Sequence, residues 1–387
     1  MPRTTPQLSI ITILFLSLEL SKKKWLLTFG AFGKSRRREI DAGDIKQLKS
    51  EIAFTRKHFE LPDNALVVCC YEAGRDGFWI HRMLTQLGIQ NFVVDSSSIE
   101  VNRRKRRTKN DKIDGSSLLR MLIRYHGGEK EVWSVVRVPD EEAEDARRPH
   151  REIERLKKER NAQSVRIEAL LALQGVHIPV RRDFCEKLKE TLRPDGKPLP
   201  EHLKGEVVRQ YKRIELADEQ LAELEAMHKK ELEAVEARMT QKIPAKKPQE
   251  KWLEQIIKLS QLKGIGKSAR VLVKEFFGWR DFKNGRQVGA LAGLTGTPYS
   301  SGNSQREQGI SKAGNRRVRA LMVELAWLWL RYQPESKISF WYHQNFGPSS
   351  KRSRRVGIVA VARKLLVALW RYLERGEIPE GADLKSA

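Results

Sequence analysis

One apolar run near the start of the chain constrains the fold more than any other feature of the sequence. It reads LSIITILFLSLEL, from Leu8 to Leu20. The run is too short to cross a bilayer, and it has no small-residue site typical of signal-peptide cleavage. Its β-branched residues favour a buried strand over the alternative, a targeting segment. The chain is therefore expected to build a sheet near its start, and no membrane partner is expected.

The first part of the chain alternates between strand-like and helix-like segments. ILFLSLELSKKKWLLTFGAF predicts two strands joined near residues 21–23, and SRRREIDAG allows a third. ALVVCCYEAG and NFVVDSS predict buried strands. Helices are expected over 44–59, with Asp44 as the N-cap, over 77–87, and from about Asp111 onward. This order predicts an α/β domain whose sheet begins with a three-stranded meander.

The rest of the chain is expected to be helical. Residues 139–174 and 205–242 predict two long helices separated by the loop RPDGKPLP. Their apolar residues keep heptad spacing, at Ile153, Leu156, Ile167 and Leu170 and at Ile214, Ala217, Leu221 and Leu224. Either the helices form a dimerising coiled-coil arm or they pack on their own domain.

Residues 244–251, PAKKPQEK, read as a linker to a last, mostly helical domain. Its final helix, GIVAVARKLLVALWRYLERG, is closed by Gly376, and the tail EGADLKSA is expected to be frayed. The fold class is thus α/β plus α, with domains over 1–135, 136–250 and 251–387.

The charge balance points to a polyanionic partner. The chain has 74 Lys and Arg against 49 Asp and Glu, a net charge of +25. Nucleic acid is the partner that such a charge favours. One basic run consists of Arg103, Arg104, Lys105, Arg106 and Arg107. Three cysteines without a CxxC spacing argue against a thiolate zinc site and fit a reducing cytoplasm.

Four acidic residues make a candidate metal site. Glu19 and Glu72 come at the ends of two predicted strands, and Asp111 and Asp114 lie three apart at a helix start. Carboxylates so placed can hold one or two Mg²⁺ ions, which polarise a scissile phosphate. The spacing alone is weak evidence, because the aspartates can simply cap their helix.

Two further motifs suit phosphate. LKGIGKSARVLVKEF resembles the turn of helix-hairpin-helix DNA-binding motifs: Gly264 and Gly266 let backbone amides approach a phosphate, and Lys263 and Lys267 suit the DNA backbone. The alternative is a tight turn between helices that binds nothing.

In TPYSSGNSQREQGISKAGNRRVRALM, Pro298 and Gly302 bracket Ser300 and Ser301 in a predicted turn. The basic residues that follow could steady a phosphate there; they are Arg306, Lys312, Arg316 and Arg319. From the residues alone, a serine that attacks the phosphate and one that only binds it remain equally open.

Taken together, these motifs resemble those of insertion-sequence transposases of the IS110 family in its broad sense, which includes the IS1111 subgroup. LSLELSKKKWLLTF, CYEAGRDGFWIHRML and TKNDKIDGSSLLRML are similar to three N-terminal motifs of the family. LKGIGKSARVLVKEF and LAGLTGTPYSSGNSQREQGISKAGNRRVRALMVELAW are similar to its C-terminal transposase domain. The motifs agree in order and in spacing over nearly the whole chain.

The resemblance implies a RuvC-like N-terminal domain of RNase-H fold, whose DEDD tetrad falls on Glu19, Glu72, Asp111 and Asp114 and holds Mg²⁺. It implies a nucleophilic serine, Ser301 beside Gly302 or else Ser300, and a covalent phosphoserine intermediate with DNA. It further implies guidance by a structured (bridge) RNA that pairs with donor and target DNA, and a homo-oligomer, a dimer or a tetramer. The expected location is the bacterial cytoplasm, at the nucleoid.

One position departs from the family pattern, since the first acid of the tetrad is normally aspartate and here it is Glu19. The longer side chain holds a metal ion less firmly, because Mg²⁺ demands near-octahedral ligands. Two other functions stay open. One is a junction-resolving nuclease whose four acids direct water. The other is a non-catalytic nucleic-acid-binding protein, for which Glu19 marks a lost site.

Overall fold

A computed structural model of the chain describes residues 12–75, 77–99, 111–241, 244, 248–301, 304–347 and 349–385. For residues 111–114, 248, 249, 298–301 and 304–308 it describes the backbone alone. The basic run 103–107 lies outside the described residues. The chain divides into two compact units, Met1–Asp140 and Glu141–Ala387, which we call the N-terminal and the C-terminal unit.

The N-terminal unit is built on a five-stranded mixed sheet with the strand order β3-β2-β1-β4-β5. The strands are β1 (Ile13–Leu20), β2 (Lys24–Ala31), β3 (Lys34–Asp41), β4 (Leu66–Glu72) and β5 (Gln90–Val94). The first three pair in antiparallel fashion, and β4 lies parallel to both β1 and β5. The predicted meander is therefore confirmed, and so is the strand at residues 13–20 of the apolar run.

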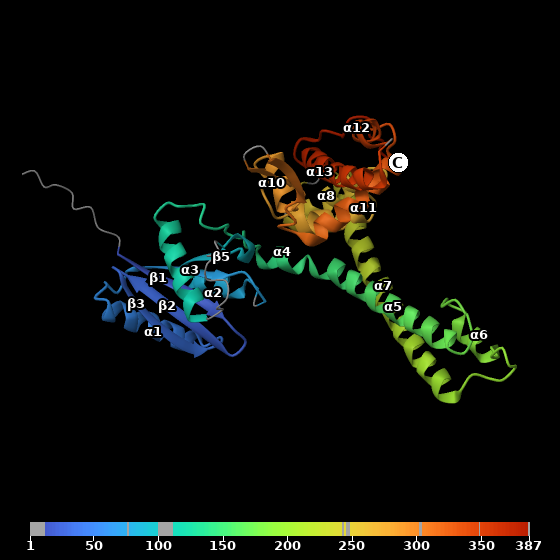
Figure 1. Ribbon diagram of the computed structural model, residues 1–387, viewed down its shortest axis with the longest axis horizontal. Coiled ribbons are helices and arrows are strands. Elements are labelled where there is room, and N and C mark those ends of the chain that lie inside the picture. The colour runs from blue at the N-terminus through green and yellow to red at the C-terminus, as the bar shows by residue number, and fades with distance from the viewer. Residues whose placement is uncertain are drawn as a thin grey trace, which may run out of the picture. The chain divides into compact units, whose positions relative to one another are not determined.

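Helices cover both faces of this sheet (Figure 1). Helices α1 (Ile45–His58) and α2 (Trp79–Gln86) pack on one face, which carries Leu14, Leu16 and Leu18. Helix α3 (Asp111–His126) packs on the other, against Val68 and Cys70. The alternation of apolar side chains along β1 and β4 produces these two cores. A 3₁₀ turn, Ser96–Ser98, follows β5.

The predicted cap of α1 is confirmed. The Asp44 side chain accepts a hydrogen bond from the backbone N–H of Gln47 at 2.8 Å, as an N-cap aspartate does.

The C-terminal unit begins with a pair of long antiparallel helices (Figure 1). The helices at this end are α4 (Glu141–Asp145), α5 (Arg148–Ala172), α6 (Phe184–Glu190) and α7 (Glu201–Thr240). Ile153 and Leu156 of α5 pack against Leu221 of α7, whereas Ile167 packs near Ile214. Most of the heptad residues are thus buried between two helices of one chain, and Leu170 and Leu224 are partly buried there. The short helix α6 was not predicted, because its seven residues carry too little periodicity.

The remaining helices enclose the largest core of the chain. They are α8 (Pro248–Ser260), α9 (Ser268–Leu272), a π-helical segment (Val273–Phe277), α10 (Gly285–Leu291), α11 (Arg316–Tyr332), α12 (Lys337–Phe346) and α13 (Lys351–Arg375). Trp329 of α11 and Leu365 of α13 are fully buried there. Gly376 ends α13 with φ of 74°, so the predicted left-handed cap is confirmed. No helix of the described residues is long and apolar enough to span a membrane.

Two expectations about the C-terminal unit are wrong. The predicted linker 244–251 contains the start of α8, since proline is well tolerated at a first helical position. The tail is docked and not frayed up to residue 385. The Gln333 side chain exchanges hydrogen bonds of 2.9 and 2.7 Å with the backbone of Asp383, and Lys385 N–H donates to Gln261 C=O at 2.7 Å.

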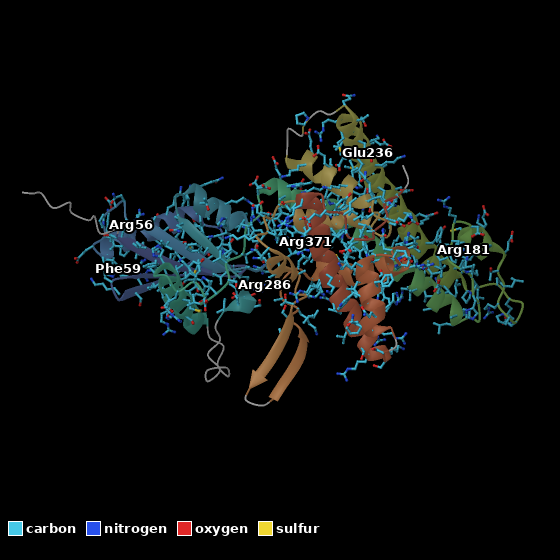
Figure 2. The ribbon with its side chains drawn as sticks, turned by 90° about the horizontal axis from the view of Figure 1, so that it is seen from above. Arg56, Phe59, Arg181, Glu236, Arg286 and Arg371 are labelled. Atoms are coloured by element: carbon cyan, nitrogen blue, oxygen red, sulfur yellow. The ribbon has the colours of Figure 1, made fainter. Side chains whose placement is uncertain are left out.

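The serine segment is also different from the expectation, because it is a strand and not a turn. Strands β6 (Gly296–Ser301) and β7 (Ser304–Ile310) form a hairpin, which extends away from the helices of this unit in Figure 2. Ser300 pairs with Gln305 and Ser301 with Ser304. Pro298 lies where the register shifts, so its missing N–H is tolerated. Both serines thus belong to the last two paired positions of β6.

Candidate active site

Glu19 and Glu72 lie side by side near two strand ends. Strands β1 and β4 are parallel, and Leu18 pairs with Tyr71, so the next residue of each strand is level with the other. Ser17 and Cys70, two residues earlier, face α3, because the Ser17 hydroxyl donates to Gly115 C=O and Cys70 packs in the α3 core. Since strand side chains alternate, Glu19 and Glu72 belong to that same face. The sheet therefore presents two neighbouring carboxylates toward α3.

The first turns of α3 lie directly over Glu19. A Cβ atom built on Gly115 would sit 2.5 Å from Glu19 Oε1 and 2.8 Å from Thr28 Oγ1. The Ser17 hydroxyl fixes this approach with a 3.0 Å hydrogen bond to Gly115 C=O. The helix begins at Asp111, so the backbones of both predicted aspartates belong to the turn that precedes this contact. Glycine at position 115 is what lets the helix come so near the carboxylate.

The donor types at this place fit a hard divalent cation. Glu19 is half-buried and Glu72 is exposed, so solvent and substrate can reach the strand ends. Carboxylate oxygens are the ligands that Mg²⁺ prefers. Among the described side chains, no group of three or more His, Cys, Asp and Glu gathers tightly enough to hold a metal ion. The side chains of Asp111 and Asp114 lie outside that description, so the site as described supplies two of the four predicted ligands.

The basic residues after the hairpin have different surroundings. Lys312 is exposed and has a φ of 56°, in the left-handed region. Arg316 is exposed at the first turn of α11, whose cap Asn315 accepts hydrogen bonds from Arg317 and Val318 N–H. Arg319 instead donates to the Ala292 and Ala313 carbonyls at 3.3 Å, where it holds the preceding loop. Of the predicted phosphate clamp, Lys312 and Arg316 are thus the described side chains that face solvent; the Arg306 side chain lies outside the description.

The glycine turn, residues 261–267, joins α8 to α9, as predicted. Gly264 and Gly266 have φ of 87° and 48°, which favours glycine at both positions. Both lysines are engaged in ion pairs within the unit, Lys263 with Asp383 at 2.9 Å and Lys267 with Glu225 at 2.7 Å. The turn therefore packs against the tail and α7, and its lysines reach a phosphate only by exchanging these partners.

A buried carboxylate that sequence reasoning missed connects the long helix α5 to this region. Glu275, in the π-helical segment, accepts from Arg151 Nε at 2.6 Å and Nη2 at 2.9 Å and from His150 Nε2 at 2.8 Å. Asn315, the cap of α11, approaches the same carboxylate at 3.4 Å. A lone acid inside the apolar run VLVKEFF was the only signal in the sequence. Glu275 thus ties α5 to the helix start that follows the serine hairpin.

The protonation of this network follows from its contacts. Burial raises the pKa of Glu275, but the hydrogen bonds from Arg151 and His150 outweigh burial and hold that pKa well below its usual range. Burial also lowers the pKa of His150, so its imidazole is neutral at pH 7. Because an ionised carboxylate can only accept, the proton of His150 resides on Nε2. The network is one anion held by one guanidinium and two neutral donors, His150 and Asn315.

Comparison with known proteins gives consistent relatives. A family model described as "Transposase IS116/IS110/IS902 family" matches residues 257–340, which include the glycine turn and the serine hairpin. "Putative transposase y4rJ" of Sinorhizobium fredii is 41% identical over 382 residues, 96% of this chain and 95% of that protein. "Putative transposase y4qE" of the same species is 27% identical, over 83% of this chain and 72% of that protein.

A third relative is named after an insertion sequence element. The "Transposase for insertion sequence element IS1328" of Yersinia enterocolitica is 24% identical, over 80% of this chain and 85% of its own length. The full-length similarity to y4rJ and the match to the family model agree with the motifs read from the sequence. The chain is a DNA transposase and belongs to the IS110 family of insertion-sequence transposases.

Proposed function

We propose that this transposase exchanges DNA strands through a covalent bond between Ser301 and a DNA phosphate, with Glu19, Glu72, Asp111 and Asp114 as the ligands of Mg²⁺. The observation that carries the proposal is the approach of α3 to Glu19 at Gly115, next to the strand end that bears Glu72. The sheet, a three-stranded meander followed by two parallel strands, supports a RuvC-like domain of RNase-H fold. The glycine turn supports a helix-hairpin-helix-like contact with the DNA backbone.

The chemistry needs no external energy source. The Ser301 hydroxyl oxygen forms a bond to phosphorus while one P–O bond of the DNA backbone breaks. The serine loses a proton and the departing sugar oxygen gains one, so the step is balanced. One phosphodiester replaces another, and attack by a second DNA end reverses the exchange and frees the serine. Mg²⁺, when bound, would polarise the phosphate. Lys312 and Arg316 lie at the base of the hairpin, away from Ser301 at its tip, and would bind neighbouring phosphates of the same DNA.

Further parts of the proposal concern partners. A structured guide RNA would pair with donor and target DNA, and a dimer or tetramer would bring the acidic site and the serine together on one substrate. The net charge of +25 supports contact with more than one nucleic acid. Residues 1–135 would supply the metal ligands, 136–250 the contacts for assembly and RNA, and 251–387 the serine.

A denaturing gel and a native gel together distinguish this function from its rivals. The full chain is incubated with the DNA of its element, the RNA encoded beside it and Mg²⁺, then denatured and separated. We expect a protein band shifted by covalently attached DNA. Cut DNA without that band would identify a metal-dependent nuclease. Intact DNA, together with a retarded complex on a native gel, would identify a protein that only binds nucleic acid.

Changes at Glu19 test its role as a metal ligand. Glu19→Asp is expected to keep or raise the rate of strand exchange, because it restores the shorter side chain that the family normally has at this position. Glu19→Gln is expected to abolish strand exchange, since an amide lacks the negative charge that offsets the charge of Mg²⁺. The measurement is turnover of a supercoiled donor across a Mg²⁺ titration. Identical curves for the wild type and both variants would remove Glu19 from the site.

A methyl group at position 115 tests the contact itself. Gly115→Ala is expected to lower strand exchange at least about tenfold, because the Cβ atom displaces the Glu19 carboxylate or the Thr28 hydroxyl. Thermal stability should change little, since alanine favours a helix over glycine by about 1 kcal/mol and this offsets the crowding. Ser117→Ala in the same helix is the matched control. Equal activity of the two variants would show that the close approach has no role.

A further inference from the structure

Two adjoining hollows of the C-terminal unit lie beside the serine hairpin, and we call them together the groove. It consists of two hollows of about 1380 Å³ and about 500 Å³, which share Arg363, Val367 and Arg371 of α13 as a common wall. At one end the groove reaches Gly296 and Gly309, at the base of the hairpin. At the other end it reaches residues 284–286 at the start of α10. It therefore leads from the strands that carry the serines to a second helix of the unit.

The wall of the groove is strongly basic. Arg363 and Arg371 are eight residues apart on α13, so they lie on one face of that helix, and Arg286 stands across from them on α10. Arg286 and Arg371 are both marked in Figure 2. None of these three arginines has a carboxylate partner among the residues that the structure describes. Such a cluster of like charges is stabilised when an anion lies between them.

The acids of the groove do not cancel this charge. Glu377 and Glu380 line the larger hollow, but each already faces a cation, Arg375 at 3.5 Å and Lys337 at 2.7 Å. Lys312 and Lys364 add two further positive charges. The groove thus carries a net positive charge along its whole course, which favours a polymer with repeated negative charges.

The floor of the groove is apolar. Val359, Ala360 and Ala368 of α13 form it, and Phe340 of α12, which is 65% exposed, stands at its side. A free phosphate gains nothing from such a floor. A nucleic-acid duplex would present phosphates and groove edges, because its base faces are stacked inside. An unpaired strand offers phosphates for the arginines and flat base faces for the apolar floor.

We propose that this groove binds an unpaired DNA strand, with its phosphates on Arg363, Arg371 and Arg286 and its bases over the apolar floor and Phe340. The choice of DNA rests on the proposed function: Ser301 lies at the tip of the hairpin, five residues of β6 from Gly296 at the base, so a strand joined to the serine would follow the hairpin for about 17 Å to enter the groove. The groove holds that strand while its partner strand is exchanged. Its binding needs neither the serine hydroxyl nor a metal ion.

Equilibrium binding of a labelled 20-nucleotide single-stranded DNA to the full chain tests this proposal without Mg²⁺. The variant Arg363→Gln/Arg371→Gln is compared with Arg352→Gln/Arg355→Gln, which removes the same charge from the same helix outside the groove. The groove variant is expected to bind about tenfold more weakly, and the slope of log affinity against log salt to fall by about 1.4 for two lost phosphate contacts. The control variant should stay within about twofold of the wild type.

The outcomes separate cleanly. Equal losses of affinity in both variants would mean that only the overall charge matters, and they would refute the proposal. Unchanged affinity of the groove variant for the single-stranded DNA would also refute it, even if its affinity for an RNA of the same sequence fell. A loss confined to duplex DNA would refute the unpaired strand. The same titrations on the Ser301→Ala variant distinguish groove binding from the serine mechanism, because groove binding does not need the serine hydroxyl. Groove binding without any covalent adduct in the wild type would leave this inference standing and overturn the serine mechanism.

Discussion

Replacing Ser301 with alanine is expected to abolish strand exchange, by about 10³-fold or more, while nucleic-acid binding stays within about twofold of the wild type. The serine would supply the atom that bonds to phosphorus, and the substitution removes that atom. Binding should survive because the many Lys and Arg contacts supply most of the affinity. The measurement is recombination of a supercoiled donor, together with a native gel shift of the same DNA.

Ser300→Ala is the matched control, since it removes the same hydroxyl one position earlier in β6. If Ser300→Ala stops recombination and Ser301→Ala does not, the nucleophile is Ser300. If both variants recombine at the rate of the wild type, neither serine bonds to DNA. The covalent band on a denaturing gel should disappear with the same residue that stops recombination.

Replacing Glu275 with alanine is expected to lower the local free energy of unfolding around α5 and α11 by about 3 kcal/mol. The substitution leaves His150, which is 4% exposed, without its acceptor and Arg151 without its bidentate partner. The loss is smaller than for a fully buried ion pair, because the Arg151 side chain is 42% exposed and regains water. Hydrogen exchange of the α5 and α11 amides, followed by mass spectrometry, measures the local change.

Glu159→Ala provides the control for Glu275. It removes a carboxylate of the same helix pair, but one that makes an exposed ion pair with Arg155 at 2.9 Å. Its effect on exchange should stay below about 0.5 kcal/mol. Protection of α11 that is unchanged in the Glu275 variant would contradict the role of this carboxylate as a joint between the two helices.

The parts of the fold that could be predicted depend on neighbouring residues. Asp44 caps α1 through a bond to Gln47, three residues away, and Gly376 ends α13 by its own backbone freedom. The tail could not be predicted in this way, because Asp383 is held by Gln333, fifty residues earlier in the chain. A polar tail carries no signal of a partner that only the folded core presents.

The site shows the same limit. The sequence predicts that Glu19 and Glu72 lie at the ends of two strands. It also predicts that Asp111 and Asp114 lie at the start of a helix. That β4 pairs with β1, and not with β3, is a matter of topology, and only this pairing brings the two glutamates together. Arg319 was expected at a phosphate because arginine suits one. In the folded chain its guanidinium donates to the carbonyl of Ala292, directly after α10, and to that of Ala313, shortly before α11. Charge in a sequence does not reveal which groups are already satisfied within the fold.

The antiparallel helices α5 and α7 have a mechanical consequence. Helix α5 is held at its first turn by Glu275 and runs a further 21 residues to Ala172, which is about 32 Å at 1.5 Å per residue. A rotation of about 5° at the held end therefore moves the far end, near α6, by about 3 Å. Conversely, a molecule that binds the far end of α5 exerts a large torque on the contacts of Glu275, because its force acts at a distance of about 32 Å. Because Asn315 contacts the same carboxylate, such a torque acts directly on the start of α11, the helix that follows the hairpin of β6 and β7.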